Sequence, residues 1–361
     1  MVELKTIHNI DVRGKAVVLR VDFNCPTEKG KLLDTFRIDR TIPTVKHLLG
    51  KGAEKIVIIS HLGRPDGAFQ KDFSLAPIVR YFSEHLAEGV SLAAEATLVP
   101  HDADIKKCIE DVAKIFRGIV FLENIRFWKE EEAGDEGFAG QLAGMGEIFV
   151  NDAFSACHRA HASISGIPKY IPGYAGLLLA EEIEQIGRAV EDPARPAVAI
   201  VGGAKLETKM PVLKKLAEKY DKVLVGGLIA VELDSDAKSR AELPGEVVIL
   251  PTGYVDDKKR DIDQTSAEVF AEIIKGAKTI LWNGPMGKFE EKPFDYATKV
   301  VGDAVAEANK NAYTVIGGGE TIEAANMAGI FDKVDFVSTG GGAMLELIGG
   351  AKLPGIEALK K

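Results

Sequence analysis

Short apolar runs rich in Val and Ile recur along the chain, and each of them ends in Gly, Asn, Asp, His or Pro. Stretches with the apolar spacing of amphipathic helices lie between these runs. Near-continuous apolar strands that alternate with helices are typical of parallel sheets covered on both faces. We therefore predict an α/β fold. The predicted strands lie within residues 16–24, 55–65, 118–127, 147–154, 197–205, 222–227, 246–251, 279–285, 313–319 and 336–342.

The number of predicted strands is larger than one open sheet usually contains. The alternation of strands and helices is interrupted at residues 155–195. That stretch combines several prolines and glycines with an amphipathic helix predicted at residues 177–190. We interpret it as the link between two doubly wound, Rossmann-like parallel-sheet domains, an N-terminal one at residues 1–172 and a C-terminal one at residues 196–347. Residues 173–195 form the expected hinge segment and interdomain helix.

Two further helices are predicted in the second domain. One covers residues 206–220, directly after the strand that ends at Gly203. The other covers residues 265–276, and either Thr265 or Ser266 is its expected N-cap, because a hydroxyl oxygen can accept a hydrogen bond from the first backbone amides of a helix.

The composition of the 361 residues, with 46% hydrophobic and 27% charged positions, is that of a soluble globular protein. The cysteines Cys25, Cys108 and Cys157 lack CxxC spacing, which argues against a zinc ribbon or a disulfide framework and favours a reducing cytoplasm. The formal net charge of −9 disfavours binding to nucleic acid. No apolar run approaches the roughly 18 residues of a membrane span, and the N-terminal segment lacks a signal-peptide core, so no membrane partner is expected.

Polar residues gather at the predicted strand ends of the first domain, where doubly wound sheets bind ligands. They are Asp22, Asn24, His61, Arg64, Asn124, Arg126, His158, Arg159 and His161, with Arg37 in an expected loop. Guanidinium groups pair with phosphate and carboxylate oxygens through parallel hydrogen bonds, so the pattern indicates a small polyanion that carries hydroxyl groups. Each arginine alone could equally form a surface ion pair worth ~0 to 1 kcal/mol, but several at strand ends favour an anion site.

Cys157, His158 and His161 have a spacing that places metal ligands on one helix turn. No fourth ligand accompanies them. We therefore expect an anion clamp or a polar packing role here rather than a zinc site.

Glycines end the strands of the second domain. They lie at residues 202–203, 226–227, 284 and 287, 317–319 and 340–342. Glycine lets backbone N–H groups approach phosphate oxygens, and helices that begin there point their positive dipole ends at them. One such pair is usually a tight turn, but their repetition indicates a phosphate-binding floor, although neither a Walker A loop nor a complete G-x-G-x-x-G fingerprint occurs. Lys205 and Lys209 are expected to share a helix face, and Glu320 is a candidate ligand for Mg²⁺ carried by a nucleotide.

Taken in order, these residues resemble the phosphoglycerate kinase family over nearly the whole chain. The resemblance begins at RVDFNCP (20–26) and extends to FVSTGGGAMLELIGGAKLPGIEAL (336–359). Between them lie SHLGRP (60–65), LENIRFW (122–128), NDAFSACHRAHAS (151–163), GGAKLETK (202–209), LWNGPMGKFE (281–290) and GGGET (317–321). So many family-typical strings in the same order make the resemblance highly specific.

The resemblance implies a cytoplasmic, monomeric phosphotransferase of glycolysis and gluconeogenesis with a carboxyl group as acceptor, which reversibly converts 1,3-bisphosphoglycerate and ADP into 3-phosphoglycerate and ATP. By motif, phosphoglycerate would bind to Asp22, Asn24, Arg37, His61, Arg64, Arg126 and Arg159. The nucleotide would bind to Lys205, Lys209, Gly226, Gly227, Asn283, Glu290, Gly317, Gly318, Gly319, Glu320 and Thr321, with Mg²⁺ on Glu320. The catalytic groups would be Arg37, Lys205, Lys209 and the backbone of Gly340, Gly341 and Gly342.

The resemblance also implies a tail at residues 348–361 that packs back on the first domain. Because the acid and the nucleotide would bind to different domains, the hinge at residues 173–195 is expected to close during the reaction. The nucleophile toward ATP is an ionised carboxylate, so catalysis requires positioning and charge stabilisation but no general base.

The chain departs from the family pattern mainly in the second domain. Glu320 stands where Asp is usual, Leu228 takes the place of a third glycine, Gly253 replaces a usual Asp, and the segment 230–263 is shorter than usual. An alternative function is therefore a non-catalytic phosphometabolite-binding protein with a decayed nucleotide site. The retained lysines and acidic residues of the nucleotide motifs argue against that alternative.

Overall fold

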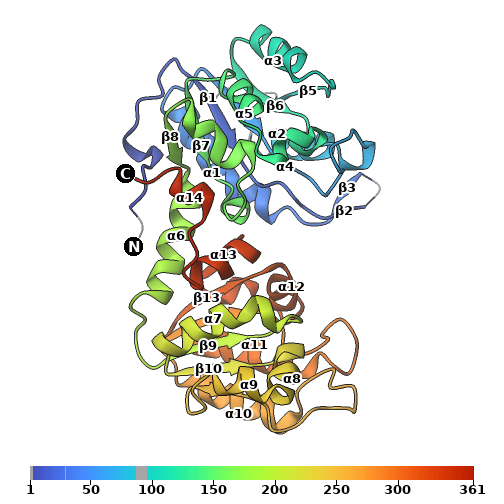
Figure 1. Cartoon of the computed structure of the whole chain (residues 1–361), viewed down its shortest axis with the longest axis vertical. Helices are drawn as coiled ribbons and strands as arrows, with labels where there is room; N and C mark the ends of the chain where they lie inside the picture. Colours follow the sequence, from blue (N-terminus) through green and yellow to red (C-terminus); the bar gives the residue numbers. More distant parts are fainter. Residues whose placement is uncertain (1–2, 29, 87–95) are drawn as a thin grey trace. The chain divides into compact units, whose positions relative to one another are not determined.

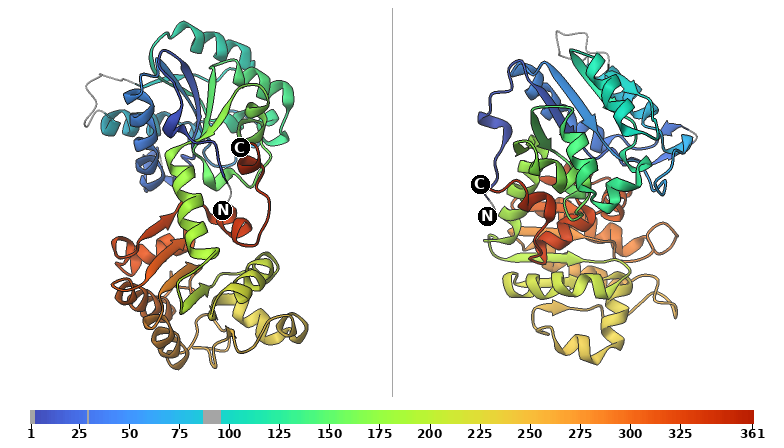
Figure 2. Two further views of the ribbon diagram at one scale, coloured as in Figure 1. Left: turned by 90° about the vertical axis from the view of Figure 1, so that its left-hand side faces the viewer. Right: turned by 45° about the horizontal axis from the view of Figure 1, so that its top comes forward.

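The molecule divides into two compact units, which Figure 1 and Figure 2 show as ribbons. The first unit contains the described residues up to Glu181 together with Lys352–Lys361, and the second contains Glu182–Ala351. The chain therefore passes between the units twice, once inside helix α6 (Leu177–Val190) and once after Ala351. This computed structural model describes residues 3–28, 30–86 and 96–361.

The first unit is built on a six-stranded sheet in which neighbouring strands are parallel. The strand order is β5-β6-β4-β1-β7-β8, so the order reverses beside β1. The strands are β1 (Ala16–Arg20), β4 (Lys55–Ile59), β5 (Ala96–Val99), β6 (Gly118–Leu122), β7 (Ile148–Asn151) and β8 (Gly173–Ala175), with a separate antiparallel pair, β2 (Thr27–Glu28) and β3 (Lys31–Leu32).

Helices lie on both faces of this sheet, as the left view of Figure 2 shows. The helices of this unit are α1 (Phe36–Gly50), α2 (Ala76–Leu86), α3 (Ile105–Lys114), α4 (Lys129–Ala133), α5 (Glu136–Ala143) and α14 (Pro354–Glu357). Short helical turns complete the unit: η1 (Ile7–Asn9), η2 (Lys71–Phe73), η3 (Ile125–Phe127), η4 (Phe154–Ala156), η5 (Ala162–Gly166) and η6 (Ile167–Lys169).

The second unit repeats this plan with a parallel sheet in the order β11-β10-β9-β12-β13-β14, which reverses between β9 and β12. Its strands are β9 (Ala197–Val201), β10 (Lys222–Val225), β11 (Val248–Ile249), β12 (Thr279–Asn283), β13 (Tyr313–Gly317) and β14 (Phe336–Ser338). Its helices are α7 (Leu206–Lys219), α8 (Gly227–Ser235), α9 (Ala237–Ala241), α10 (Gln264–Lys275), α11 (Tyr296–Ala308), α12 (Gly319–Met327) and α13 (Gly341–Ile348), with one short turn, η7 (Phe331–Lys333).

Burial on both sheet faces explains why these strands are apolar throughout. Every residue of β9 and β12 is buried, and the two strands pair in register from Ala197 opposite Thr279 onward. In the first unit, the rings of Phe23, Phe82 and Phe121 pack with centroids 5.3 to 6.1 Å apart beside the sheet. The predicted α/β class with two doubly wound parallel sheets is therefore confirmed.

The strands differ from the predicted runs mainly at their ends. Every predicted strand is present but shorter than its predicted run, so most motif residues lie in loops or helix starts, while Asn151, Asn283 and Gly317 are the last residues of β7, β12 and β13. Strands β5 and β8 were not predicted, and β8 lies inside the segment that the sequence assigned to the hinge. The N-cap of α10 is Asp263, which accepts a hydrogen bond from the Ser266 amide at 2.9 Å, so the expected caps Thr265 and Ser266 are wrong. Asp263 directly precedes the helix, so its carboxylate can accept a hydrogen bond from the Ser266 amide. Thr265 and Ser266 already lie inside the helix, where a side-chain hydroxyl cannot reach the first free amides.

The apolar faces of the helices that the structure describes pack into the cores of the two units. None of these helices is both long enough and apolar enough to cross a membrane. Cys25, Cys108 and Cys157 are all buried and carry free thiols.

Candidate active site

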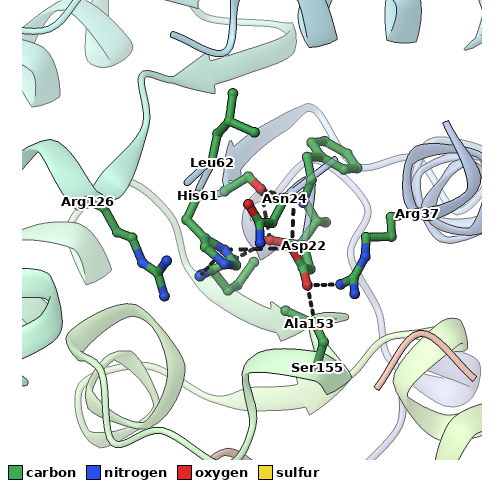
Figure 3. A network of polar contacts seen from close by, with 12 residues as sticks. Asp22, Asn24, Arg37, His61, Leu62, Arg126, Ala153 and Ser155 are labelled. Carbon is green, nitrogen blue, oxygen red and sulfur yellow. Dashed lines mark hydrogen bonds and ion pairs between the residues drawn. The ribbon is translucent and has the colours of Figure 1, made fainter. Parts of the chain in front are cut away.

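The carboxyl ends of β1, β4 and β7 meet where the first sheet reverses its strand order, which is the usual ligand position in doubly wound sheets. Asp22 follows β1, His61 follows β4 and Ser155 follows β7. Arg37 lies in the first turn of α1, so its expected loop position is wrong. Figure 3 shows Asp22 and His61 at the centre, with Arg37 and Arg126 on opposite sides.

Asp22 is the centre of this cluster, and its side chain is almost fully buried. It forms an ion pair with Arg37 and accepts hydrogen bonds from the hydroxyl of Ser155 and, at 2.8 Å, from the backbone amide of Asn24. Burial alone would raise the pKa of Asp22, but the charge of Arg37 and these hydrogen bonds hold the pKa well below its usual range. Asp22 is therefore an anion that fixes the Arg37 guanidinium group.

Arg20 and His61 are two further buried members of the cluster. Arg20 Nε donates to Ser163 Oγ at 2.7 Å, and its Nη2 lies 3.2 Å from His61 Nδ1. Burial lowers the pKa of Arg20, and burial also moves the pKa of His61 well below its ordinary value against the opposing charge of Asp22. His61 is therefore neutral at neutral pH. Because arginine only donates, Nδ1 is the acceptor and the ring proton resides on Nε2.

Sequence reasoning missed both Arg20 and Ser155 as members of this site. The signal for Arg20 was present, because a charged residue ends a strand that is otherwise apolar and opens the string RVDFNCP. Nothing in the sequence distinguished Ser155, since its partner Asp22 lies 133 positions earlier in the chain.

The remaining arginines of the motif occupy different environments. Arg126 is buried, donates from Nη1 to the Gly63 carbonyl at 2.7 Å and places Nε 3.1 Å from Glu132 Oε1. Burial lowers its pKa to about 10 against the opposing charge of Glu132, and the charge of the half-buried Arg159 acts in the same direction as burial. Arg64 is exposed in the loop after β4. The structure thus brings most of the predicted arginines together and leaves Arg64 in solvent.

The two asparagines have separate roles. Asn24 is exposed, so its side chain is accessible to a ligand. Asn124 is fully buried and accepts hydrogen bonds from the amides of Leu62 and Arg126 at 3.2 and 3.1 Å. Its amide group donates to the carbonyls of Leu62 and Phe73 at 2.7 and 2.9 Å. Asn124 therefore holds the loop after β4 and is not a ligand.

The histidines after β7 do not form a metal centre. His161 lies 3.7 Å from the buried carboxylate of Glu131, and its pKa is lowered to about 3 by burial and by the neighbouring arginines. Within the part of the chain that the structure describes, no cluster of three or more His, Cys, Asp or Glu has the geometry of a metal site.

The second unit carries a cavity of about 390 Å³ at the carboxyl ends of its strands. Three predicted nucleotide ligands line it: Gly227 after β10, Glu290 in the loop after β12, and Glu320 in the first turn of α12. The full lining consists of Gly203, Ala204, Gly227, Leu228, Lys259, Arg260, Pro285, Gly287, Lys288, Glu290 and Glu320.

Lys209 lies close to Gly203, one of the residues that line this cavity, and bonds the end of β12. It is buried in α7, and its ammonium group donates to Asn283 Oδ1. Asn283 Nδ2 donates in turn to the Gly317 carbonyl at 2.5 Å. Burial lowers the pKa of Lys209 to about 8, against the opposing charge of Glu320. The nearby Thr321 is also buried, and its hydroxyl accepts a hydrogen bond from the amide of Gly284 at 2.7 Å.

Lys205 differs from Lys209 because it stands outside the helix. It is the N-cap residue of α7 and is exposed, so the expected shared helix face is wrong. Gly203 and Gly227 approach each other closely beside it: both have positive φ angles, 111° and 63°, and a Cβ on Gly227 would lie 2.8 Å from the backbone of Gly203. Only glycine fits this crossing of the backbone.

The glycines after β14 begin helix α13. Gly341 and Gly342 are its first residues, where backbone N–H groups have no partner within the helix. The Gly340 amide instead donates to Ser338 Oγ at 3.1 Å, and that hydroxyl donates to the buried carboxylate of Glu182 at 2.7 Å. Glu182 therefore supports the loop from which the α13 amides emerge.

Two doubly wound sheets, one with a guanidinium-rich edge and one with a glycine-lined cavity and a buried lysine, define a two-domain α/β phosphotransferase. The family model described as "Phosphoglycerate kinase" matches residues 7–240 and 234–351. The chain belongs to the phosphoglycerate kinase family. It is an enzyme of the class that transfers phosphoryl groups with a carboxyl group as acceptor, and nothing supports the non-catalytic alternative.

Curated relatives and solved structures agree with this assignment. The chain is 39% identical to phosphoglycerate kinase of Pelotomaculum thermopropionicum, covering 98% of each chain, and 40% identical to that of Dictyoglomus turgidum, covering 97% of this chain and 96% of the relative. The structure of phosphoglycerate kinase from Coxiella burnetii matches with a TM-score of 0.81 and 32% identity, covering 99% of this chain and 98% of that chain. The enzyme from Pyrococcus horikoshii matches with a TM-score of 0.82, 29% identity and the same coverage.

The family match consists of two parts. They overlap at residues 234–240. This position lies within the segment 230–263 that the sequence indicated as shorter than usual.

Proposed function

We propose that the first unit binds phosphoglycerate and the second binds the nucleotide during reversible phosphoryl transfer from 1,3-bisphosphoglycerate to ADP. The observation that carries this assignment is the different chemistry of the two strand edges. One edge gathers guanidinium groups around the ionised Asp22, and the other carries a cavity lined by glycine backbone, with the buried Lys209 close to the lining residue Gly203. Guanidinium forks suit a small phosphorylated acid, whereas glycine-lined helix starts suit a polyphosphate.

The proposed phosphoglycerate ligands are Asp22, Asn24, Arg37, His61, Arg64, Arg126 and Arg159. Asp22 holds Arg37 through one edge of its guanidinium group, which leaves the other N–H groups for the substrate. The neutral ring of His61 offers an N–H donor at Nε2. Since the attacking carboxylate is already ionised, these residues position it and stabilise charge, and no group has to remove a proton.

The proposed nucleotide ligands are Lys205, Lys209, Gly226, Gly227, Asn283, Glu290, Gly317, Gly318, Gly319, Glu320 and Thr321. Lys209 is held by Asn283 close to the cavity, and its charge would compensate phosphate oxygens there. The exposed Lys205, Arg37 and the amides at Gly340–Gly342 would stabilise the transferring phosphoryl group. Glu290 would bind the ribose.

We further propose that Glu320 holds Mg²⁺ together with the nucleotide phosphates. The residue fits this role, because its carboxylate lines the cavity and Mg²⁺ is usually bound by one or two carboxylates plus substrate phosphates. The ion would supply charge neutralisation between neighbouring phosphates. Glu320→Asp should preserve Mg²⁺-dependent turnover, whereas complete loss would show that the longer carboxylate is required.

Transfer requires the two ligands to be brought together, because they bind to different units. We propose that this closure turns about the two chain crossings, in α6 and after Ala351. Solution scattering should record a smaller radius of gyration with both ligands than with either alone, and an unchanged profile would contradict closure. We also propose a cytoplasmic monomer, and three cysteines outside any disulfide suit a reducing compartment.

A coupled assay of ATP consumption with 3-phosphoglycerate tests the assignment. Arg126→Ala should raise the KM for 3-phosphoglycerate at least tenfold, since a charge-assisted hydrogen bond is worth about 1.5 to 3 kcal/mol. Arg117→Ala is the matched control, because this arginine of the same unit is 84% exposed and pairs with Glu54. Equal effects of both variants, or a change confined to the KM for ATP, would contradict the proposal.

A further inference from the structure

One wall of the second-unit cavity has no role in the function proposed so far. Lys259, Arg260 and Lys288 line this wall beside Glu290. Arg260 differs from the two lysines in carrying a planar group, and neighbours in the loops 254–262 and 287–294 hold that group in place.

Asp256 fixes Arg260 at two points. Its Oδ2 accepts a hydrogen bond from Arg260 Nε at 2.8 Å and lies 2.7 Å from Nη2. Its Oδ1 accepts a hydrogen bond from the backbone amide of Arg260 at 3.0 Å. On the other side, the Arg260 carbonyl accepts a hydrogen bond from the Lys288 amide at 2.8 Å, which ties the two loops together.

The remaining contacts of Arg260 cover a second edge and one face of the guanidinium group. Nη1 lies 3.7 Å from Glu291 Oε2, and the central carbon lies 3.9 Å above the ring of the buried Phe294. Yet the side chain is still 37% exposed and lines the cavity. Phe294 covers one face of the guanidinium group, so the part left for a ligand is the opposite flat face. The N–H edges suit phosphate poorly, because Asp256 bonds one of them and the Glu291 carboxylate faces Nη1.

A flat cationic face is suited to a flat π system. The proposed ribose ligand Glu290 lies on the same loop as Lys288 and Glu291, so the base that follows the ribose comes within reach of Arg260. Leu228, an apolar side chain that is 49% exposed, lines the same cavity. The lining contains no neutral amide or hydroxyl side chain that could read the edge of a base.

We propose that the nucleobase stacks on the free face of Arg260, with Leu228 adding apolar contact, so that Arg260 positions the base end of the nucleotide. This inference rests on the proposed nucleotide site of the second unit. It makes Arg260 a binding residue for the base and gives it no part in holding phosphate.

Calorimetric binding of two probes to the full-length protein separates these roles. ADP carries a base, and inorganic pyrophosphate does not. Arg260→Lys keeps the charge but removes the planar face, so we expect the Kd for ADP to rise about five- to tenfold and the Kd for pyrophosphate to change less than about twofold. In turnover, the KM for ATP should rise while kcat is retained.

The matched control is Arg188→Lys, which removes an equivalent stack, 3.8 Å above the ring of Tyr313, outside the cavity lining. It should leave the Kd for ADP unchanged. If Arg260→Lys lowers the unfolding temperature, Arg260→Gln serves as the second variant: its planar amide keeps a polar group above Phe294 and should preserve more ADP affinity than Arg260→Met.

Each outcome decides one question. An unchanged Kd for ADP in Arg260→Lys, or equal losses for ADP and pyrophosphate, would overturn stacking on Arg260. The same loss of ADP binding in Arg188→Lys would also overturn it, because the effect would then be general to the unit. Failure of the wild-type protein to bind ADP at all would instead contradict the proposed nucleotide site.

Discussion

The buried carboxylate of Glu182 is expected to control the loop before α13, to which we assign a catalytic role, through three hydrogen bonds. Its Oε2 accepts from Ser338 Oγ at 2.7 Å, and its Oε1 accepts from the amide and the hydroxyl of Thr339 at 2.6 and 2.7 Å. All three residues are buried. Glu182→Ala removes these acceptors together and leaves the Thr339 amide, which cannot rotate away, without its partner.

The size of the effect follows from these contacts. An unpaired buried donor costs about 1 to 3 kcal/mol, and the empty space left by the side chain adds to it, so Glu182→Ala should lower the free energy of unfolding of the second unit by about 3 to 5 kcal/mol. Glu182→Gln retains a carbonyl oxygen for Thr339 and lets Ser338 accept from the new amide. It should cost about 1 to 2 kcal/mol, mainly through lost charge.

Tryptophan fluorescence during urea unfolding measures this difference. The two tryptophans lie in different units, so Trp128→Phe leaves Trp282 as the reporter of the second unit. The Ser338 hydroxyl also accepts a hydrogen bond from the Gly340 amide, so loss of Glu182 should disturb the start of α13. We therefore expect kcat to fall further in Glu182→Ala than in Glu182→Gln. Equal losses in the two variants, or a loss below about 1 kcal/mol in Glu182→Ala, would refute the reasoning by showing that the donors find other partners.

Three further predictions concern charge in the two sites. The pKa of Asp22 is lowered in the folded state, so the ionised carboxylate stabilises the protein above about pH 4, and this stabilisation is lost as the pH falls. Asp22→Asn should lower the free energy of unfolding by about 2 to 3 kcal/mol at neutral pH. The variant should also show a weaker loss of stability in acid when urea unfolding is measured as a function of pH. The pKa of Lys209 is about 8, so ADP affinity should decline as the pH rises through this value, and a calorimetric pH series on Lys209→Met should lose that decline. Arg37→Ala and Lys205→Ala should each reduce kcat about a hundredfold. In urea unfolding, only Arg37→Ala should destabilise its unit, by about 2 kcal/mol, because it removes the ion-pair partner of buried Asp22. Lys205 is exposed, so Lys205→Ala should change stability by less than about 0.5 kcal/mol.

The sequence predicted the fold well because its strongest signal, continuous apolar strands that stop at polar residues, reflects burial between two helix layers. It also predicted which polar residues gather at the strand ends, since strand ends in doubly wound sheets converge on one edge. It could not rank those residues. The central position of Asp22 depends on Ser155 and Arg37, and the buried state of Lys209 beside exposed Lys205 depends on where α7 begins.

Long-range contacts explain what the sequence analysis missed. Arg20 meets Ser163 across 143 positions, and Glu182 meets Ser338 across 156 positions. The amphipathic pattern of residues 177–190 predicted a helix, but a helical pattern does not say which partner receives a polar side chain. The short strand β8 contains two half-buried residues, so it lacked the apolar run on which strand prediction relied.

The first unit is assembled from two separate stretches of chain. Leu4 forms a bridge with Lys360, and the Gly355 amide donates to the Cys157 carbonyl at 2.9 Å. A Cβ at Gly355 would lie 2.9 Å from the Cys157 backbone, so the returning segment fits closely. On a ribosome, the residues that complete this unit are made only after the whole of the second unit. The usual N-terminal-first order of domain folding is therefore reversed in its final step: the second unit can fold during synthesis, while the first must wait for its closing segment.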